Sequence, residues 1–220
     1  MPLLIVAGAG SWARSLAVVA QRCLESPIAA YAVDREHRDR DTVDGIPLRE
    51  IDEVLDSEDP STCEWLVGIV DYRHRMKGRA EIVDRLHARG HSIRGLVDPS
   101  ACVDGASIDP SALVFGGAIV GPGASIGPMT AVVQGAIVSH HTTVGSCCYV
   151  GPGTSISGNV TIGARTFVGV GAVVRDGVSI GSRCLIGAGA VVLADVPDGT
   201  VVVDRHEPTP RRGQNAPPTS

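Results

Sequence analysis

A six-residue repeat in the second half of the chain limits the folds that this sequence can adopt. Every sixth residue from Ile108 to Val192 is valine or isoleucine, while the flanking residues vary. Neither an amphipathic helix nor a series of hairpins keeps an unbroken period of six over such a span. The aliphatic positions are Ile108, Val114, Val120, Ile126, Val132, Val138, Val144, Val150, Ile156, Ile162, Val168, Val174, Ile180, Ile186 and Val192. The repeat therefore predicts a stack of equivalent short units.

Each unit is predicted to be a short strand followed by a tight turn. The residue two positions before the aliphatic one is mostly Ala, Thr or Cys, and the residue after it is often glycine. Side chains alternate across a strand, so the aliphatic and the small residue share a face and point inward, and glycine suits the turn. Three units make a triangular coil of eighteen residues, which gives five coils. Cys148 and Cys184 fall on small positions, where we expect core packing.

The N-terminal part has a different pattern. Its apolar runs alternate with amphipathic ones in a β-α-β-α-β-α order, which is half of a doubly wound nucleotide-binding fold. Gly8, Gly10 and Asp34 resemble the dinucleotide fingerprint. Ala13 at the last glycine position, and the presence of a single half, argue against a bound NAD(P) cofactor. The expected elements are a strand, glycine turn and helix over 3–24, a strand over 29–36, a helix over 48–57, a strand over 65–70 and a helix over 73–90.

Composition excludes several classes of function. Only 3% of the residues are aromatic and 27 of 220 are glycine, which fits a narrow interior of small side chains. The formal net charge is −5, without a basic cluster near stacking aromatics, so no nucleic-acid partner is expected. No apolar stretch approaches the roughly eighteen residues of a membrane span, so no membrane partner is expected either. The six cysteines lack CxxC spacing and no signal peptide precedes them, so we expect reduced thiols in a cytoplasmic protein.

The two halves together resemble one family. The segments that carry the resemblance are "VAGAGSWARSLAVVA", "VDGIPL", "IRGLVDPSA", "IVSHHTTVG" and "SGNVTIG". The chain is similar to the sialic-acid O-acetyltransferase and nucleotide-aminosugar N-acetyltransferase family, in which a Rossmann-like head precedes a left-handed parallel β-helix. The resemblance implies a homotrimer that uses acetyl-CoA as co-substrate and needs no metal. It also implies that the head holds the acceptor, the β-helix holds the donor, and the active site lies between neighbouring β-helices.

The resemblance assigns a general base. His140 falls on the histidine of a family motif like I-x-H-[ED]-x-x-[IV]-G, and imidazole suits proton transfer near neutral pH. His141 stands where the family commonly has an acidic residue, so the orientation of the His140 ring must be set differently here. One coil is eighteen residues, which stacks His141 on Asn159. Asn159, together with Gln134, which stands where an asparagine is typical, is a candidate for orienting the ring.

Other positions are carried over to the two substrates. On the donor side these are Tyr149, Gly158, Val170 and Ala188; Tyr149 is alternatively an outward residue at a contact between subunits. The family's closing Val-Gly-x-Pro-Ala segment is replaced by "VVDRHEP", so the binding of the adenosine end of CoA is expected to differ from that of the family. On the acceptor side the candidates are Gly10, Ser11, Trp12, Asp34, Arg35 and Asp71.

The sequence therefore predicts an α/β head over 1–96, a left-handed β-helix over 97–203 and a disordered tail over 204–220. The expected activity is transfer of an acetyl group, or of a small related acyl group, from CoA to the amine of a sugar that is preferably linked to a nucleotide. Transfer to a hydroxyl of a sugar or natural product stays open, as does a non-catalytic trimeric scaffold that binds a nucleotide. A γ-type carbonic anhydrase would need a third histidine near His140 and His141, but the next histidine is His206.

Overall fold

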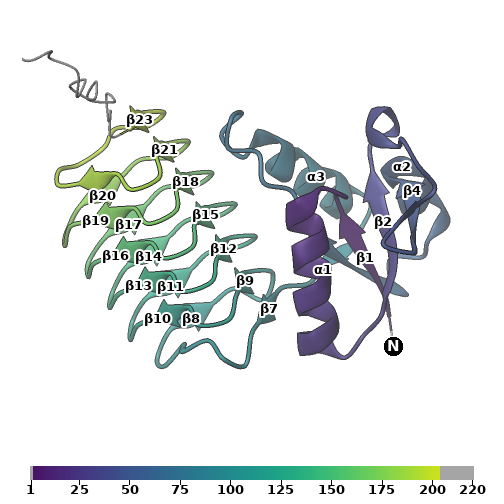
Figure 1. The fold of residues 1–220 in the computed structure, drawn as a ribbon, viewed down its shortest axis with the longest axis horizontal. Coiled ribbons are helices and arrows are strands. Elements are labelled where there is room, and N and C mark those ends of the chain that lie inside the picture. Colours follow the sequence, from purple (N-terminus) through teal and green to yellow (C-terminus); the bar gives the residue numbers. More distant parts are fainter. Residues whose placement is uncertain (1, 204–220) are drawn as a thin grey trace, which may run out of the picture.

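The computed structural model describes residues 2–203. A compact α/β head stands against one side of a stack of triangular coils (Figure 1). The predicted tail over 204–220 lies outside the described residues. Within residues 2–203, no helix has the length and apolar character that a membrane span requires.

The head is built on a twisted sheet whose strands run in the order β3-β4-β2-β1-β5-β6. Its neighbouring strands pair in parallel except β3 and β4, which pair antiparallel. The strands are β1 (Leu3–Ala7), β2 (Ile28–Val33), β3 (Thr42–Val43), β4 (Ile46–Glu50), β5 (Cys63–Val67) and β6 (Ser92–Ile93). The helices are α1 (Ser11–Leu24), the 3-10 helix η1 (Arg35–His37), α2 (Ile51–Ser57) and α3 (Lys77–Ala88).

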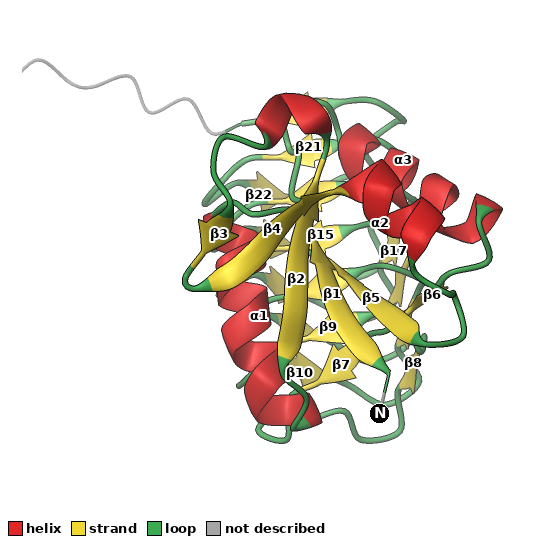
Figure 2. Ribbon diagram, turned by 90° about the vertical axis from the view of Figure 1, so that its right-hand side faces the viewer, coloured by secondary structure: helices red, strands yellow, loops and turns green. Residues whose placement is uncertain are grey.

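Both faces of the central strand β1 are buried, because side chains alternate across it. Leu4 and Val6 pack with α1 on the face toward the coils, while Ile5 and Ala7 pack with α2 and α3 on the other face. This explains why the β1 segment is an unbroken apolar run, as parallel strands covered on both sides usually are. Figure 2 shows α2 and α3 together on one side of the sheet and α1 on the other.

Several predicted boundaries in the head need correction, among them that of the strand over 29–36, which ends at Val33 before the 3-10 helix η1. The predicted helix over 48–57 begins only at Ile51, because Leu48 to Glu50 belong to β4. Asp44 and Gly45 both have positive φ, which fits the primed turns of tight hairpins, so the chain turns back here as the β3–β4 hairpin. That hairpin was missed.

The third predicted strand and the helix after it are also shorter than expected. The strand over 65–70 starts earlier and ends at Val67, since the chain turns at Gly68 beside the start of α1. The helix over 73–90 begins at Lys77, because Arg75 and Met76 adopt left-handed backbone conformations that interrupt a right-handed helix.

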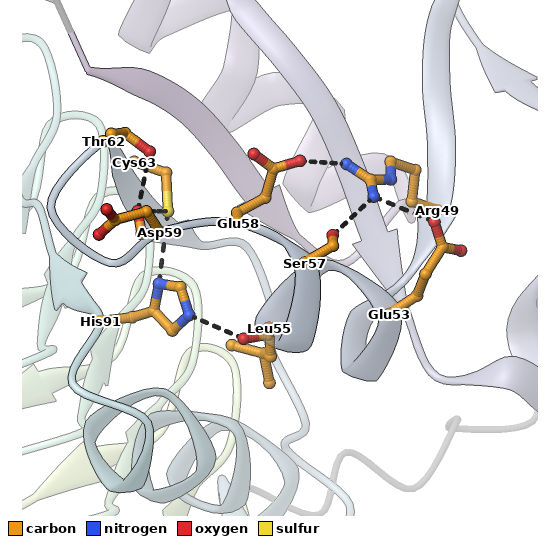
Figure 3. A network of polar contacts seen from close by, with 9 residues as sticks. All are labelled: Arg49, Glu53, Leu55, Ser57, Glu58, Asp59, Thr62, Cys63 and His91. Atoms are coloured by element: carbon orange, nitrogen blue, oxygen red, sulfur yellow. Dashed lines mark hydrogen bonds and ion pairs between the residues drawn. The ribbon is translucent and has the colours of Figure 1, made fainter.

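Polar contacts fasten α2 to its neighbours (Figure 3). The Arg49 guanidinium donates to Glu58 at 2.6 Å and to Glu53 and Ser57 at 3.0 Å. Beneath it, the buried His91 lies 3.3 Å from the Cys63 sulfur through Nδ1 and 3.3 Å from the Leu55 carbonyl oxygen through Nε2. Burial raises the pKa of the Cys63 thiol, so the thiol stays protonated at neutral pH.

The repeat forms a triangular β-helix, as predicted, and residues one coil apart pair in parallel. We name the first of its three sheets after the head that covers it, and the other two after the character of their outward side chains. The head-facing sheet contains β7 (Leu96–Val97), β9 (Leu113–Val114), β12 (Ala131–Val132), β15 (Tyr149–Val150), β18 (Phe167–Val168), β21 (Leu185–Ile186) and β23 (Val201–Val202). The apolar sheet contains β10 (Ile119–Val120), β13 (Ile137–Val138), β16 (Ser155–Ile156), β19 (Val173–Val174) and β22 (Val191–Val192). The hydroxyl sheet contains β8 (Ser107–Ile108), β11 (Ser125–Ile126), β14 (Thr143–Val144), β17 (Thr161–Ile162) and β20 (Ser179–Ile180).

The interior of the β-helix confirms the inward assignment of the repeat. The aliphatic positions and the small positions form one core cluster, in which Cys148 and Cys184 are fully buried. Buried threonines at small positions satisfy their hydroxyls with turn carbonyls. Thr142, for example, donates to the Ser157 carbonyl at 2.8 Å, and Thr166 donates to the Gly181 carbonyl at 2.8 Å. A threonine can therefore replace alanine here without leaving a buried hydroxyl unpaired.

The head and the β-helix share two apolar clusters. One joins α1 to Leu113, Phe115 and Tyr149 of the head-facing side, and the other surrounds the turn residues Met129 and Cys147 with α2, α3 and β5. The predicted boundary between 96 and 97 falls inside β7, which pairs with β9 of the β-helix. The two parts are thus packed as one body.

Candidate active site

His140 lies at the corner where the apolar sheet meets the hydroxyl sheet, in the turn between β13 and β14. Its ring covers Gly158, one coil further along. A methyl group on Gly158 would lie 2.5 Å from His140 Nε2, so no side chain fits beneath the ring. Both His140 and His141 are solvent-exposed in the single chain. The imidazole is therefore supported from one side and accessible from the other.

The two histidines contact each other. Nδ1 of His140 is 3.3 Å from Nδ1 of His141, and the ring planes meet at 75°. His141 has a φ of 55°, and its Cδ2 would lie 2.9 Å from a methyl group added to Gly123 in the preceding coil. Glycines above and below thus leave room for a pair of rings at this corner.

The predicted orienting residues do not contact either ring. The Asn159 side chain donates to Asp176 at 3.4 Å, while its backbone N–H donates to the His140 carbonyl at 3.0 Å. Gln134 lies at a different corner, between β12 and β13, where its carbonyl accepts the Gly153 N–H. Within residues 2–203, the polar contact found for the His140 ring is the one with His141.

Tyr149 lies on the head-facing sheet. Its ring stacks on Phe167 at 4.9 Å with an interplanar angle of 2°, and it meets Trp12 edge-on at 5.4 Å. Trp12 also packs on Phe115 at 5.0 Å. A cavity of about 300 Å³ opens beside Tyr149 and is lined by Ser11, Trp12, Ser15, Val70 and Tyr149. Burial raises the pKa of the Tyr149 hydroxyl, so it remains a protonated donor at neutral pH.

A second cavity, of about 280 Å³, opens at the glycine turn of the head. Its lining residues are Ala9, Gly10, Val33, His37, Asp39, Arg40, Val43 and Leu48. The sequence reasoning identified Gly10 here and missed His37, Asp39 and Arg40. The charged run that follows β2 was the available signal, because ligands of such folds bind beyond the carboxyl ends of the strands.

Asp34, Arg35 and Asp71 are not among the residues that line these two cavities, and each already has a polar partner. Asp34 accepts from Arg85 at 2.6 Å, and the exposed Arg35 is 3.9 Å from Glu50. Asp71 accepts from His74 Nδ1 at 2.8 Å and from the Gly78 N–H at 3.3 Å. Asp71 thereby shapes the loop after β5.

The predicted donor residues lie at two corners of the β-helix. Gly158 is beneath His140, whereas Val170 and Ala188 lie one coil apart at the corner between the head-facing and apolar sheets. Val170 is exposed, and its carbonyl accepts the Gly189 N–H at 2.8 Å. The structure brings Gly158 to His140 but does not bring Val170, Ala188 or Tyr149 to it within one chain.

The topology of the triangle explains this separation. His140 is at the corner opposite the head-facing sheet, and the head with both of its cavities covers that sheet. Within one chain, His140 and the two cavities of the head therefore lie on opposite sides of the β-helix. Over residues 2–203, no cluster of three or more His, Cys, Asp or Glu side chains has the arrangement of a metal site.

The comparisons with known proteins agree with this architecture. Residues 159–194 match the family model "Bacterial transferase hexapeptide (six repeats)". No curated protein sequence matches the chain. The acetyltransferase domain of PglB from Neisseria gonorrhoeae, in complex with acetyl coenzyme A, superposes with a TM-score of 0.79 at 28% identity, covering 90% of this chain and 94% of that one.

Two further structures are similar over nearly the whole chain. PerB from Caulobacter crescentus, in complex with CoA and GDP-perosamine, has a TM-score of 0.80 at 27% identity and covers 91% of this chain and 93% of that one. WeeI from Acinetobacter baumannii shares the fold with a TM-score of 0.83 at 20% identity, covering 93% and 97%. The left-handed β-helix with a Rossmann-like head is thereby confirmed. The chain is thus similar, over its head and its β-helix together, to hexapeptide-repeat sugar acetyltransferases of the kind that the sequence resemblance indicated.

Proposed function

We propose that the protein transfers an acetyl group from acetyl-CoA to the amine of a nucleotide-linked sugar. The head, residues 1–96, binds the acceptor, and the β-helix, residues 97–203, binds the donor. Similarity over the whole described chain to PglB with acetyl coenzyme A and to PerB with CoA and GDP-perosamine supports this assignment. The observation that carries it is the exposed His140, held over Gly158 and paired through Nδ1.

The Nδ1 contact makes His140 a suitable general base. When Nδ1 of His140 carries the proton and donates to His141, the Nε2 lone pair of His140 is free to accept a proton from the acceptor amine. His141 thus takes over the orienting role of the family's acidic residue. It does so as a neutral acceptor, which supplies direction without a fixed negative charge.

The reaction is then a direct transfer. The amine nitrogen attacks the thioester carbonyl carbon while His140 takes the amine proton. The tetrahedral intermediate collapses with cleavage of the carbon–sulfur bond, and the thiolate of CoA leaves and recovers that proton from His140. Backbone N–H groups of the glycine turns are the natural donors for the oxyanion. The chemistry requires no acyl-enzyme and no metal.

We propose a homotrimer as the active form. The outward side chains Ile119, Ile137, Val173 and Val191 form an exposed apolar ladder along the apolar sheet, interrupted by Ser155 between Ile137 and Val173, and an exposed apolar patch marks an interaction surface. His140 lies at the edge of this ladder. A cyclic assembly would bring His140 of one copy toward the head cavities and Tyr149 of another, and would place Val170 and Ala188 along the same interface.

The glycine-turn cavity is our candidate for the nucleotide. Gly10 lets a ligand approach the backbone at the start of α1, where helix N–H groups favour phosphate. Arg40 lines this cavity and Arg35 belongs to the same charged run after β2, so both supply positive charge nearby. Asp34 and Asp71 follow the carboxyl ends of β2 and β5, the side of the sheet where ligands of such folds bind. Ser11 and Trp12 connect the glycine turn to the cavity beside Tyr149, where we place the sugar.

The test is acetyl transfer to UDP- and GDP-linked amino sugars, with free CoA measured as it is released. We expect His140→Ala to lower kcat by at least about a hundredfold, the lower end for a lost general base. His87→Ala, a change at an exposed histidine of α3, is the matched control. Near-normal turnover by His140→Ala would remove it from the mechanism, and turnover only with hydroxyl acceptors would redirect the assignment to O-acetylation.

A further inference from the structure

Arg79 on α3 is the fully buried charged side chain at the junction of the head and the β-helix. Burial lowers its pKa to about 10, so it still carries its charge at neutral pH. The groups that it contacts are backbone carbonyls, and no ion pair with a carboxylate is found for it within residues 2–203. A buried charge of this kind is costly unless its contacts are well formed.

The guanidinium bridges the two parts of the molecule. Its Nη1 donates to the carbonyl of Val67, the last residue of β5, at 2.9 Å and to the carbonyl of Ile69, just beyond that strand, at 3.0 Å. Its Nε donates to the Met129 carbonyl at 2.9 Å, in the turn before β12 of the β-helix. The buried Nη2 has no partner.

The head segment that Arg79 holds supports the glycine turn. Gly68 lies between the two accepting carbonyls, and a methyl group on it would be 2.7 Å from the Cβ of Ala13 in α1. The Gly68 N–H donates to the Ala7 carbonyl at 2.8 Å, and a methyl group on Gly8 would lie 3.0 Å from the Gly68 oxygen. A displacement of this segment would therefore move the glycine turn and the start of α1.

The β-helix side of the bridge is equally constrained. Met129 is buried, and its backbone is held in the left-handed region with a φ of 59°. Its backbone N–H is also held in place, because it donates a hydrogen bond to the Ser111 hydroxyl at 3.0 Å. The carbonyl that faces Arg79 thus has a fixed direction.

We propose that Arg79 is a positioning residue that sets the place of the acceptor pocket relative to the β-helix. The inference rests on the proposed function, in which the acceptor held by the head must reach a base on a β-helix. An apolar side chain of similar length would fill the same space without an unpartnered nitrogen, and replacing buried charges in this way often costs no stability. What such a side chain cannot supply is the three directed hydrogen bonds.

The test compares Arg79→Met and Arg79→Lys with Arg89→Met, a matched change at a more exposed arginine of the same helical segment. Hydrogen–deuterium exchange is measured for peptides that contain residues 67–71 and 127–131, and steady-state kinetics are measured separately for acceptor and acetyl-CoA. For Arg79→Met we expect exchange to quicken about tenfold in both segments, since their local opening becomes easier. We expect kcat/KM for the acceptor to fall about 10- to 100-fold, as small misplacements of a reacting group can.

The KM for acetyl-CoA should stay within about twofold of the wild-type value, because the donor binds the β-helix. For Arg79→Lys, the exchange rates and kcat/KM for the acceptor should lie between those of the wild type and those of Arg79→Met. Arg89→Met should change neither readout. If Arg79→Met does not fold, Arg79→Lys carries the comparison. Unchanged exchange in the two segments would overturn the proposal, as would parallel losses for both substrates. If the wild-type protein acetylates no amino sugar, the proposed function fails, and the exchange data still decide whether Arg79 couples the two segments.

Discussion

Two sheets of the same β-helix carry apolar side chains outward, yet only one of them is covered by its own chain. On the head-facing sheet, Leu113 is 1% exposed because α1 packs over it. On the apolar sheet, Ile137 is 37% exposed and Val191 is 55% exposed. The outward positions of the hydroxyl sheet are all serine or threonine, which need no cover. The aliphatic side chains of the head-facing sheet are thus covered largely by the head, whereas those of the apolar sheet are left for the neighbouring copies of the proposed homotrimer.

Introducing charged side chains on the apolar sheet should have the largest effect on assembly and activity. We expect Ile137→Asp combined with Val173→Asp to dissociate the assembly, because unpaired carboxylates would be buried between copies. Activity should fall at least about a hundredfold, since the divided site is lost. Light scattering after gel filtration gives the mass. Val18→Asp, on an exposed valine of α1, is the control. A double variant that keeps both the wild-type mass and the wild-type activity would contradict the proposal that other copies cover the apolar sheet.

On the head-facing sheet the same kind of residue should matter for folding instead. Leu113→Ala removes a side chain packed under the head and should lower the free energy of unfolding by about 2–5 kcal/mol. Val191→Ala on the apolar sheet should cost less than about 1 kcal/mol under conditions that keep the chain monomeric. Chemical denaturation measures both. Equal losses of unfolding free energy in the two variants would contradict the difference in burial between Leu113 and Val191.

The corner between the apolar and hydroxyl sheets should show the smallest effect on stability and a clear effect on rate. Gly158→Ala places a methyl group against the His140 ring, so the ring must move. Ala164 and Ala188 occupy the same position of the repeat, so the backbone accepts alanine there. We expect kcat to fall about tenfold or more, with a midpoint of unfolding close to wild type. Ser182→Ala, at the same repeat position, is the control, and an unaffected rate in Gly158→Ala would contradict the role of the ring's position.

The β-helix was more predictable than the head for a physical reason. Each six-residue unit packs against its copies one coil away, so a local pattern determines both the strand and the face that it buries. The β3–β4 hairpin has two-residue strand β3 and an Asp44–Gly45 turn, too little sequence for the pattern to reveal. The glycines at 123 and 158 became meaningful only when stacking placed them against His141 and His140.

The residues of the candidate site also differ in how far the sequence predicts their surroundings. The repeat predicts that His140 lies in a turn of the β-helix, and its role as a base is taken from the family resemblance. The partners of Trp12 and Tyr149 could not be predicted, because Phe115 and Phe167 reach them through long-range packing between the head and the β-helix. Arg79 carried no signal in the sequence, since its acceptors are backbone carbonyls whose positions depend on the whole fold.

The central claim is that one copy supplies His140 and another supplies the acceptor pocket. The most direct test mixes two inactive variants, His140→Ala and Gly10→Phe, the latter filling the glycine-turn cavity where a Cβ meets nothing within 4 Å. In randomly mixed trimers about a quarter of the sites pair an intact His140 with an intact head, so about a quarter of the wild-type activity should return. Mixed trimers that form, as shown by two affinity tags, and remain as inactive as either parent would contradict the shared site.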